Sequence, residues 1–352
     1  MGRSCEENTM FISKNRERMT LEKVITLRNN RAYITKVYSL REALKRGLET
    51  IQYKEIIKRD SVICIKVNLC DVFPKRGVIT PPDIVYEVVS FLRDRVAQAY
   101  VVESDGLLYS ADEAAKKSGI LDAVKRAGAI FINLSKDEKV RVKFKDTMYV
   151  RKLAMPKTLL RSEVFITMPV PKTHEITTYT GALKNQFGCY PQRNRVLLHP
   201  HLDEAIVDIN KILKPQIAIM DARVGIEGNG PTRGFPVKLG LLLISNNVVL
   251  CDSIMTHIMN LPVNLISHLI LAWKAGLGPL LPKKVLNNEL KLLSIKRSFK
   301  LPYKDLGVLF QRVTLTNPIT VRLFYNTPII KCIVKIGRIL RRFTLYGRTH
   351  YF

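Results

Sequence analysis

The residues best suited to chemistry lie in the middle of the chain, just after the apolar run Val164–Met168. Lys172 and His174 follow this run directly, and Lys184 and Asn185 come shortly afterwards, among prolines and glycines. A lysine ammonium group neutralises negative charge, and an imidazole transfers protons near neutral pH. We therefore expect these four side chains to belong to a site for a small anionic substrate.

Two roles are open for Lys172 and Lys184. A lysine that is buried beside other cations has a lowered pKa, so it can act as a base or form a covalent adduct with a carbonyl. The alternative, which we favour, is that both ammonium groups only neutralise the charge of the substrate. His174 and Asp105 are then the candidates for proton transfer.

Further polar side chains stand where other predicted strands end. Lys66 and Asn68 come at the end of one apolar run, Asp105 follows the next, and Asp221 follows a later one. In an open parallel sheet, the loops at the carboxyl ends of the strands converge on one edge, where ligands bind. We therefore predict that these residues line the same site, with Lys66, Asn68, Asn185 and Asp221 binding substrate.

A glycine-rich segment is a candidate anion-binding loop. Glycines let the backbone approach a ligand closely and present amide donors, and an arginine can hold a phosphate or carboxylate with two hydrogen bonds. We predict substrate-binding roles for Gly228, Gly230 and Arg233. The ATP-binding motif is incomplete because no lysine follows Gly230, and the dinucleotide-binding motif is incomplete because Arg233 stands at its third glycine.

His199 and His201 are candidate metal ligands. Alternate residues of an extended backbone share a face, so both imidazoles could reach one divalent metal ion if this stretch is extended. The spacing indicates no third ligand. A divalent metal is therefore a candidate cofactor on that condition alone.

Strand-like and helix-like patterns alternate along the chain, which predicts an α/β fold with a largely parallel sheet and helices on both faces. Ser39 and Ser110, each with a glutamate three residues later, mark helix starts, as does Pro81. The predicted strands are 32–37, 62–67, 99–103, 129–132, 164–168, 216–220, 241–245 and 248–251.

The composition divides the chain into a polar tail (1–20), an α/β core (21–280) and a basic helical extension (281–352). The extension contains eight Lys and seven Arg against two acidic residues. Within it, residues 329–343 place basic side chains on one helical stripe beside apolar ones, a pattern typical of helices that lie on an anionic membrane. Docking of this helix on the core is the alternative.

The formal net charge of +27 favours anionic partners: phosphorylated metabolites, anionic lipid or RNA, although no nucleic-acid-binding motif accompanies the charge. The six cysteines are scattered, mostly in apolar runs, which indicates a reducing cytoplasm. We expect neither a signal peptide nor a transmembrane helix, because the N-terminus is polar and the longest apolar runs are interrupted. No sequence feature indicates an oligomeric state.

Several short motifs follow one another in a distinctive order. They are Lys66-Val-Asn68, Thr80-Pro81, Pro169-Val-Pro-Lys172-Thr-His174, Thr180-Gly-Ala-Leu-Lys-Asn185, Asp221, Glu227-Gly-Asn-Gly-Pro231 and Asp252. This succession resembles the prokaryotic family called domain of unknown function family 362, which implies no particular reaction. Many relatives carry a ferredoxin-like iron–sulfur module, but its closely spaced cysteines are absent here, so the resemblance implies a version without that cluster. A more distant similarity to the nickel-pincer lactate racemase group implies an α/β enzyme that uses lysine and histidine.

Together these patterns favour an enzyme that binds a small phosphate- or carboxylate-bearing substrate at the carboxyl ends of the strands. Its reaction class is open between proton transfer and redox chemistry. The alternative is a non-enzymatic protein that uses its charge to bind RNA or an anionic membrane surface.

Overall fold

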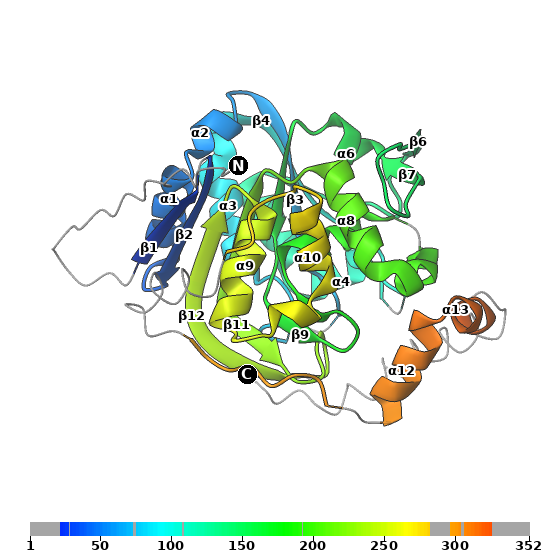
Figure 1. The fold of residues 1–352 in the computed structure, drawn as a ribbon. Coiled ribbons are helices and arrows are strands. Elements are labelled where there is room, and N and C mark those ends of the chain that lie inside the picture. The colour runs from blue at the N-terminus through cyan, green and yellow to red at the C-terminus, as the bar shows by residue number, and fades with distance from the viewer. Residues whose placement is uncertain are drawn as a thin grey trace, which may run out of the picture.

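The computed structural model describes residues 22–27, 29–72, 75–107, 109–191, 193–281, 296–303 and 306–325 of the 352-residue chain (Figure 1). Its strands are β1 (Glu22–Leu27), β2 (Asn30–Lys36), β3 (Ser61–Val67), β4 (Val96–Glu103), β5 (Ile130–Asn133), β6 (Lys139–Lys143), β7 (Lys152–Pro156), β8 (Val164–Met168), β9 (Lys172–His174), β10 (Thr178–Thr180), β11 (Ile217–Glu227) and β12 (Phe235–Ser245).

The α-helices are α1 (Leu40–Thr50), α2 (Tyr53–Ile56), α3 (Pro82–Leu92), α4 (Ala111–Lys117), α5 (Ile120–Ala127), α6 (Lys157–Arg161), α7 (Ala182–Asn185), α8 (Leu202–Leu213), α9 (Val248–Ile258), α10 (Ser267–Lys274), α12 (Leu306–Thr316) and α13 (Pro318–Tyr325). The short 3₁₀ helices are η1 (Arg93–Arg95), η2 (Gln186–Cys189), η3 (Arg193–His201) and η4 (Val263–Leu265).

The main sheet is mixed and has the strand order β1-β2-β12-β11-β8-β3-β4-β5. The strands from β11 to β5 run parallel, whereas β1, β2, β12 and β11 pair antiparallel. The short strand β9 pairs with β10 and also joins the far end of β11. The predicted α/β class is confirmed, with antiparallel strands added at one edge of the parallel part.

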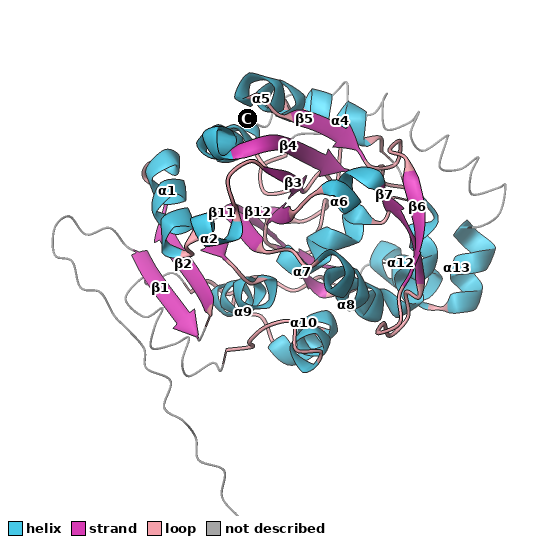
Figure 2. Ribbon diagram, turned by 90° about the horizontal axis from the view of Figure 1, so that it is seen from above, coloured by secondary structure: helices cyan, strands magenta, loops and turns pink. Residues whose placement is uncertain are grey.

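Helices cover both faces of the sheet, because the strands send alternate side chains into two hydrophobic cores. In β3, Ile63 and Ile65 enter the core formed with α1, α3 and α5, whereas Cys64 enters the core formed with α7 to α10. Figure 2 shows the strands lying between α4 and α5 on one side and α9 and α10 on the other. Lys66 follows this alternation and therefore points toward the α7 side.

Most of the predicted strands are present, but one is wrong. Residues 248–251 begin the helix α9, whose first amides donate to the side chain of Asn247. The apolar run was too short for its periodicity to separate a strand from a buried helix. Ser39 caps α1 as predicted, whereas Ser110 makes no capping hydrogen bond at α4, and Pro82 instead of Pro81 is the first residue of α3.

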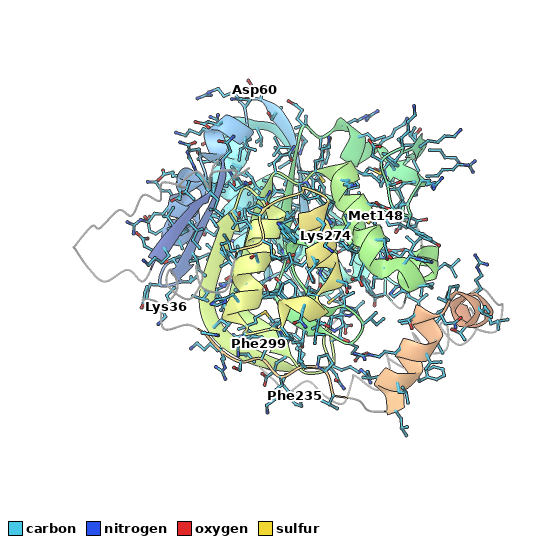
Figure 3. All side chains as sticks on the ribbon, in the orientation of Figure 1. Lys36, Asp60, Met148, Phe235, Lys274 and Phe299 are labelled. Carbon is cyan, nitrogen blue, oxygen red and sulfur yellow. The ribbon has the colours of Figure 1, made fainter. Side chains whose placement is uncertain are left out.

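The end of the core does not coincide with a clean break at residue 280. Phe299 is buried, and residues 297–300 donate to or accept hydrogen bonds from the ends of α9 and β11. Figure 3 shows Phe299 among the side chains at the lower end of the molecule. The predicted tail 1–20 and the predicted helix 329–343 lie outside the described residues, so both stay predictions.

None of the helices in the described ranges is long and apolar enough to cross a membrane.

Candidate functional site

Lys66 and Glu103 form a buried ion pair at the carboxyl ends of β3 and β4. Lys66 Nζ lies 2.8 Å from Glu103 Oε2 and 2.7 Å from the carbonyl oxygen of Val67. The carboxylate of Glu103 also accepts hydrogen bonds from the amides of Leu69 and Ser104. The charge of Lys66 is therefore neutralised within the protein, and the ion pair holds the backbone of Val67, Leu69 and Ser104 in place.

Asn185 and Gly188 hold the next segment of chain against this ion pair. Asn185 donates to Thr167 Oγ1 at 2.9 Å and to the Lys66 carbonyl at 3.2 Å, which ties α7 to β3 and β8. A Cβ atom at Gly188 would lie only 2.7 Å from Lys66 Nζ, so this close approach requires glycine. Asn185, predicted to bind substrate, thus has its amide group in contact with the protein.

Asp252 caps α7 from the facing helix α9. Its carboxylate accepts hydrogen bonds from the amides of Ala182 and Leu183, at 2.7 and 2.9 Å, and from the hydroxyl of Tyr179. A Cβ atom at Gly181 would lie 2.2 Å from this carboxylate, which explains the glycine before the helix. These contacts fix the orientation of α7 and therefore of Lys184.

Lys184 is half-buried, and its ammonium group has no hydrogen bond or ion pair among the described residues. Burial and the nearby positive charge of Lys172 together lower the pKa of Lys184 to about 8, although Cys70 and Asp203 partly oppose this shift. An ammonium group that is partly removed from water and has no acidic partner favours a bound anion. Lys184 is therefore the cation of this cluster that is available to a ligand.

Lys172, at the start of β9, is fully buried. Its Nζ donates to Asn68 Oδ1 at 2.8 Å and lies 3.6 Å from Cys70 Sγ. Burial lowers the pKa of Lys172, and the nearby Cys70 partly opposes this shift. Asn68 is in turn held by Thr80 Oγ1 and the carbonyl of Val78, so the predicted pair Lys172 and Asn68 does come together.

His174, at the end of β9, is held in its neutral form. Its Nδ1 accepts hydrogen bonds from the amides of Ile176 and Thr177, at 3.1 and 3.4 Å, so the ring proton is on Nε2. Burial lowers the pKa of His174 well below its ordinary value, and the charge of Lys184 adds to the effect. His174 can therefore donate a hydrogen bond from Nε2 at neutral pH but does not carry a charge.

His199 has the opposite tautomer. Its Nδ1 lies 2.9 Å from the carbonyl oxygen of Val196, which only accepts, so Nε2 of the neutral ring is unprotonated. Burial lowers the pKa of His199 to about 4, and the charge of Lys184 contributes. A neutral Nε2 of this kind can accept a hydrogen bond or bind a metal ion.

The paired metal site predicted for His199 and His201 depended on an extended backbone, which the structure does not provide. Both residues belong to η3, and His201 stacks on Tyr149 while His199 meets the edge of Phe187. Among the residues for which the structure gives positions, no group of three or more His, Cys, Asp or Glu side chains could hold a metal ion. The premise of that prediction is therefore wrong.

Arg195, also on η3, was not predicted to belong to the site. It donates to Ser104 Oγ and to the carbonyl oxygens of Gly188 and Tyr190, and its charge lowers the pKa of Lys184. Arg195 therefore joins η2, η3 and the end of β4 and adds positive charge beside Lys184. No motif accompanies Arg195, so this role could not be predicted from the residue pattern.

The glycine-rich segment lies on the other side of β9. Thr173 Oγ1 donates to the carbonyl oxygen of Gly228 at 2.7 Å, and successive side chains of a strand point to opposite faces. Thr173 therefore faces the glycines while Lys172 and His174 face away from them. The amide of Gly228 donates to the carbonyl oxygen of Lys300, and the amide of Gly230 donates to the carbonyl oxygen of Gly228.

Arg233, the predicted ligand-binding arginine of this segment, is paired within the protein. Its guanidinium lies 2.7 Å from Glu175 Oε1, although it remains half-exposed. The structure thus brings Gly228, Gly230 and Arg233 together with Thr173 and Glu175. It does not bring them together with Lys184.

Asp105 and Asp221 also have protein partners. Asp105 Oδ1 accepts from the amide of Ala111 at the start of α4 and from Asn133. Asp221 lies within the long strand β11, where it pairs with Arg223, and Arg223 also pairs with Asp83 at the start of α3. Both carboxylates therefore tie elements of the fold together.

Glu103 and Cys70 are further residues of this site, and neither is among the site residues predicted from the sequence. Glu103 does end a predicted strand, which was the available signal. Cys70 was one of the six scattered cysteines and was not singled out; it is half-buried beside Lys172, whereas Cys64, Cys189 and Cys251 are buried. We call Lys172, Lys184, Arg195, His174, His199 and Cys70, above the Lys66–Glu103 pair, the cationic cluster.

A separate cavity of about 230 Å³ lies at the opposite, amino-terminal end of β8. It is lined mainly by aliphatic and aromatic side chains, among them Phe144, Leu159 and Phe165. None of the residues of the cationic cluster lines it.

Comparison with known proteins places these features in a family. Residues 63–257, more than half of the chain, match the family model described as "Domain of unknown function (DUF362)". The curated "Thylakoid-associated protein sll1697" of Synechocystis sp. is 26% identical over 213 residues, which are 58% of this chain and 65% of that protein. The chain therefore matches slightly less than two thirds of the length of this relative.

Among solved structures, the lactate racemase apoprotein from Thermoanaerobacterium thermosaccharolyticum is similar with a TM-score of 0.40 and 13% identity. The match covers 55% of this chain and 50% of that chain, which is too distant to transfer any residue role. The family match, in contrast, spans β3 to α9 and includes every residue of the cationic cluster. The chain belongs to the family of domain of unknown function 362.

Proposed function

We propose that this protein is an α/β enzyme whose cationic cluster binds a small substrate bearing a phosphate or carboxylate group. The observation that carries the proposal is the state of Lys184, which is half-buried, has a pKa lowered to about 8 and lacks an acidic partner among the described residues. A bound anion would supply the missing counter-charge. Arg195 and Lys172 would add to the attraction without changing their protein contacts.

The two neutral histidines suggest how the rest of the substrate is held. His174 offers a donor at Nε2 and His199 an acceptor at Nε2, so together they match a hydroxyl group, which both donates and accepts. Lys184 is the group best suited to proton transfer, because a pKa near 8 leaves both of its protonation states populated near neutral pH. We therefore favour proton transfer over redox chemistry for the reaction class.

Titration calorimetry with inorganic phosphate and with small mono- and dicarboxylates tests this proposal. Lys184→Met keeps much of the side-chain volume and removes the charge, so we expect binding to weaken at least about tenfold, the lower bound for a hydrogen bond to a charged group. Lys274→Met, at an exposed position of α10, is the matched control and should bind as the wild type does. Equal binding by all three proteins would refute the site.

A second candidate function is peripheral association of a cytoplasmic protein with an anionic membrane. The net charge of +27 is compatible with RNA or lipid, but the curated relative is described as thylakoid-associated, which favours a membrane. Co-sedimentation of the full chain with vesicles of phosphatidylcholine, with and without phosphatidylglycerol, tests it, and single-stranded RNA is the competing ligand. A chain ended at residue 280 is unsuitable, because it would remove Phe299 from the core.

A further inference from the structure

The helices α12 and α13 expose an apolar surface of a kind that a protein seldom leaves in water. In α12, Leu306, Leu309, Phe310 and Val313 follow helical spacing and therefore share one face. Ile319 and Leu323, four residues apart, do the same in α13. These six side chains are 54% to 86% exposed, and we call them the apolar face.

The opposite side of the same helices is what attaches them to the protein. Val308, Thr314 and Val321 are buried, and both helices pack on each other and on η3. Arg312 Nε donates to the carbonyl oxygen of Glu175 at 2.8 Å, directly after His174. The helices therefore have a defined docked side, and the apolar face is the side turned away from it. In Figure 1 they form a separate projection at the lower right of the molecule.

The charge of this part of the sequence indicates what covers the apolar face. Between residues 306 and 325 the sequence contains Arg312 and Arg322 and no acidic residue. The whole stretch 281–352 holds eight Lys and seven Arg against Glu289 and Asp305. Short helices with leucine and phenylalanine on one face, set among basic residues, have the composition of helices that lie in the interfacial layer of an anionic bilayer.

The described lengths of α12 and α13 favour a position on the bilayer surface. The helix α12 has 11 residues and α13 has 8, whereas a spanning helix needs about 20. Two short helices that each expose an apolar side can instead lie flat at the level of the headgroups. Tyr303, half-exposed just before α12, has the amphipathic ring that is enriched at that depth.

We propose that the apolar face of α12 and α13 is the membrane-docking surface of this protein and inserts into the interfacial layer of an anionic bilayer. The inference rests on the membrane association proposed above and adds the surface that performs it. The apolar side chains supply the burial, and the surrounding Lys and Arg select anionic over zwitterionic lipid.

Vesicle binding by full-length variants tests the surface. The double variant Leu309→Gln with Phe310→Gln replaces two exposed side chains and should not disturb folding. We expect it to weaken partition onto phosphatidylcholine–phosphatidylglycerol vesicles at least about tenfold, because each CH₂ group that is buried in the bilayer contributes about 0.8 kcal/mol to binding. Leu265→Gln with Trp273→Gln is the matched control, because these two side chains are 52% and 48% exposed on the α10 side. The control should bind as the wild type does.

Two outcomes would overturn the inference in different ways. If the wild type binds these vesicles and the Leu309, Phe310 variant binds equally well, the surface is wrong while membrane association stands. If the wild type does not bind at all, membrane association itself fails. A wild-type dimer that the variant converts to a monomer, seen by light scattering, would assign the face to a second copy of the chain instead.

Fluorescence gives an independent measurement of insertion. Trp273 is the single tryptophan of the chain, so Trp273→Phe combined with Phe310→Trp places the only indole on the apolar face. Anionic vesicles should shift its emission to shorter wavelength, and brominated lipid should quench it. An indole that binds with the vesicles yet stays unquenched would contradict docking through this face.

Discussion

The sequence predicts an anion-binding role for both the cationic cluster and the glycine-rich segment. The two regions differ in whether their hydrogen-bond donors and charged groups already have partners within the protein. In the glycine-rich segment the amides of Gly228 and Gly230 donate to protein carbonyls, and Arg233 pairs with Glu175. In the cluster, Glu103 neutralises Lys66 but no described acidic group pairs with Lys184. The two regions lie on opposite sides of β9.

The difference shows that residue type alone does not separate a binding loop from a packing loop. Glycines are needed in both regions, but for close backbone contact: Gly188 against Lys66, Gly230 against Thr173. The cluster differs because it contains Lys184, a half-buried cation that forms no ion pair with an acidic group among the described residues.

The largest effect is expected from Lys66→Met, which leaves the buried carboxylate of Glu103 without its partner. Removing one partner of a buried ion pair costs about 3–5 kcal/mol of the free energy of unfolding. Lys117→Met removes one partner of the exposed pair with Glu113 and should cost about 0.5 kcal/mol or less. Urea denaturation followed by circular dichroism measures both, and similar losses would show that Lys66 is not the support of the cluster.

The next effect concerns ligand binding in the two regions. Lys184→Met should lower the affinity for phosphate by about 1.5–3 kcal/mol, the range for a hydrogen bond to a charged group. Arg233→Met should leave the affinity unchanged, because its guanidinium is paired with Glu175 and lies with the glycines. Calorimetry distinguishes the two, and a loss with Arg233→Met alone would move the anion site to the glycine-rich segment.

Gly230→Ala tests whether the glycine-rich segment is needed for packing. The new Cβ would lie 2.1 Å from the carbonyl oxygen of Thr173, so the backbone must shift. Overpacking of this kind costs about 1–3 kcal/mol in the free energy of unfolding. Phosphate affinity per folded molecule should stay within about twofold of the wild type, because the segment faces away from Lys184. A variant that is as stable as the wild type but no longer binds phosphate would show that the segment serves binding and not packing.

The smallest effect is a dependence of anion affinity on pH. Lys184 is charged below its pKa of about 8 and loses its charge as the pH rises through that value, so affinity should be constant near pH 7 and fall above 8. The fall approaches about tenfold per pH unit if binding requires the ammonium group. Lys184→Met should abolish this dependence. Within about one pH unit of neutrality, His174 should contribute nothing to the pH dependence of the anion affinity, because its pKa is well below the ordinary value.

The α/β class and most strands follow from alternating apolar patterns, because burial on two faces of a sheet leaves a clear trace in the sequence. The run 248–251 was ambiguous, since a fully buried helix such as α9 is apolar on all sides. The grouping of Lys66, Asn68, Lys172 and Asn185 could be predicted from strand ends. Asp221 was expected where a strand ends, whereas β11 continues beyond it to Glu227.

The rest of the site depends on contacts between segments far apart in the sequence. Arg195 reaches Ser104 across 91 positions, and Asp252 reaches Ala182 across 70, and neither interaction has a local pattern. The tautomers of His174 and His199 depend on single backbone groups. Such details could not be derived before the fold was known.

The position of η3 has a consequence for regulation. This segment carries Arg195 and His199 on the side of the cationic cluster, and α12 and α13 rest on it from the outside. Whatever shifts these helices also shifts the charges beside Lys184, so occupancy of the outer surface and occupancy of the cluster are expected to be thermodynamically linked. By reciprocity, a lipid surface that strengthens anion binding by some factor must itself be bound more tightly, by that same factor, when the anion is present.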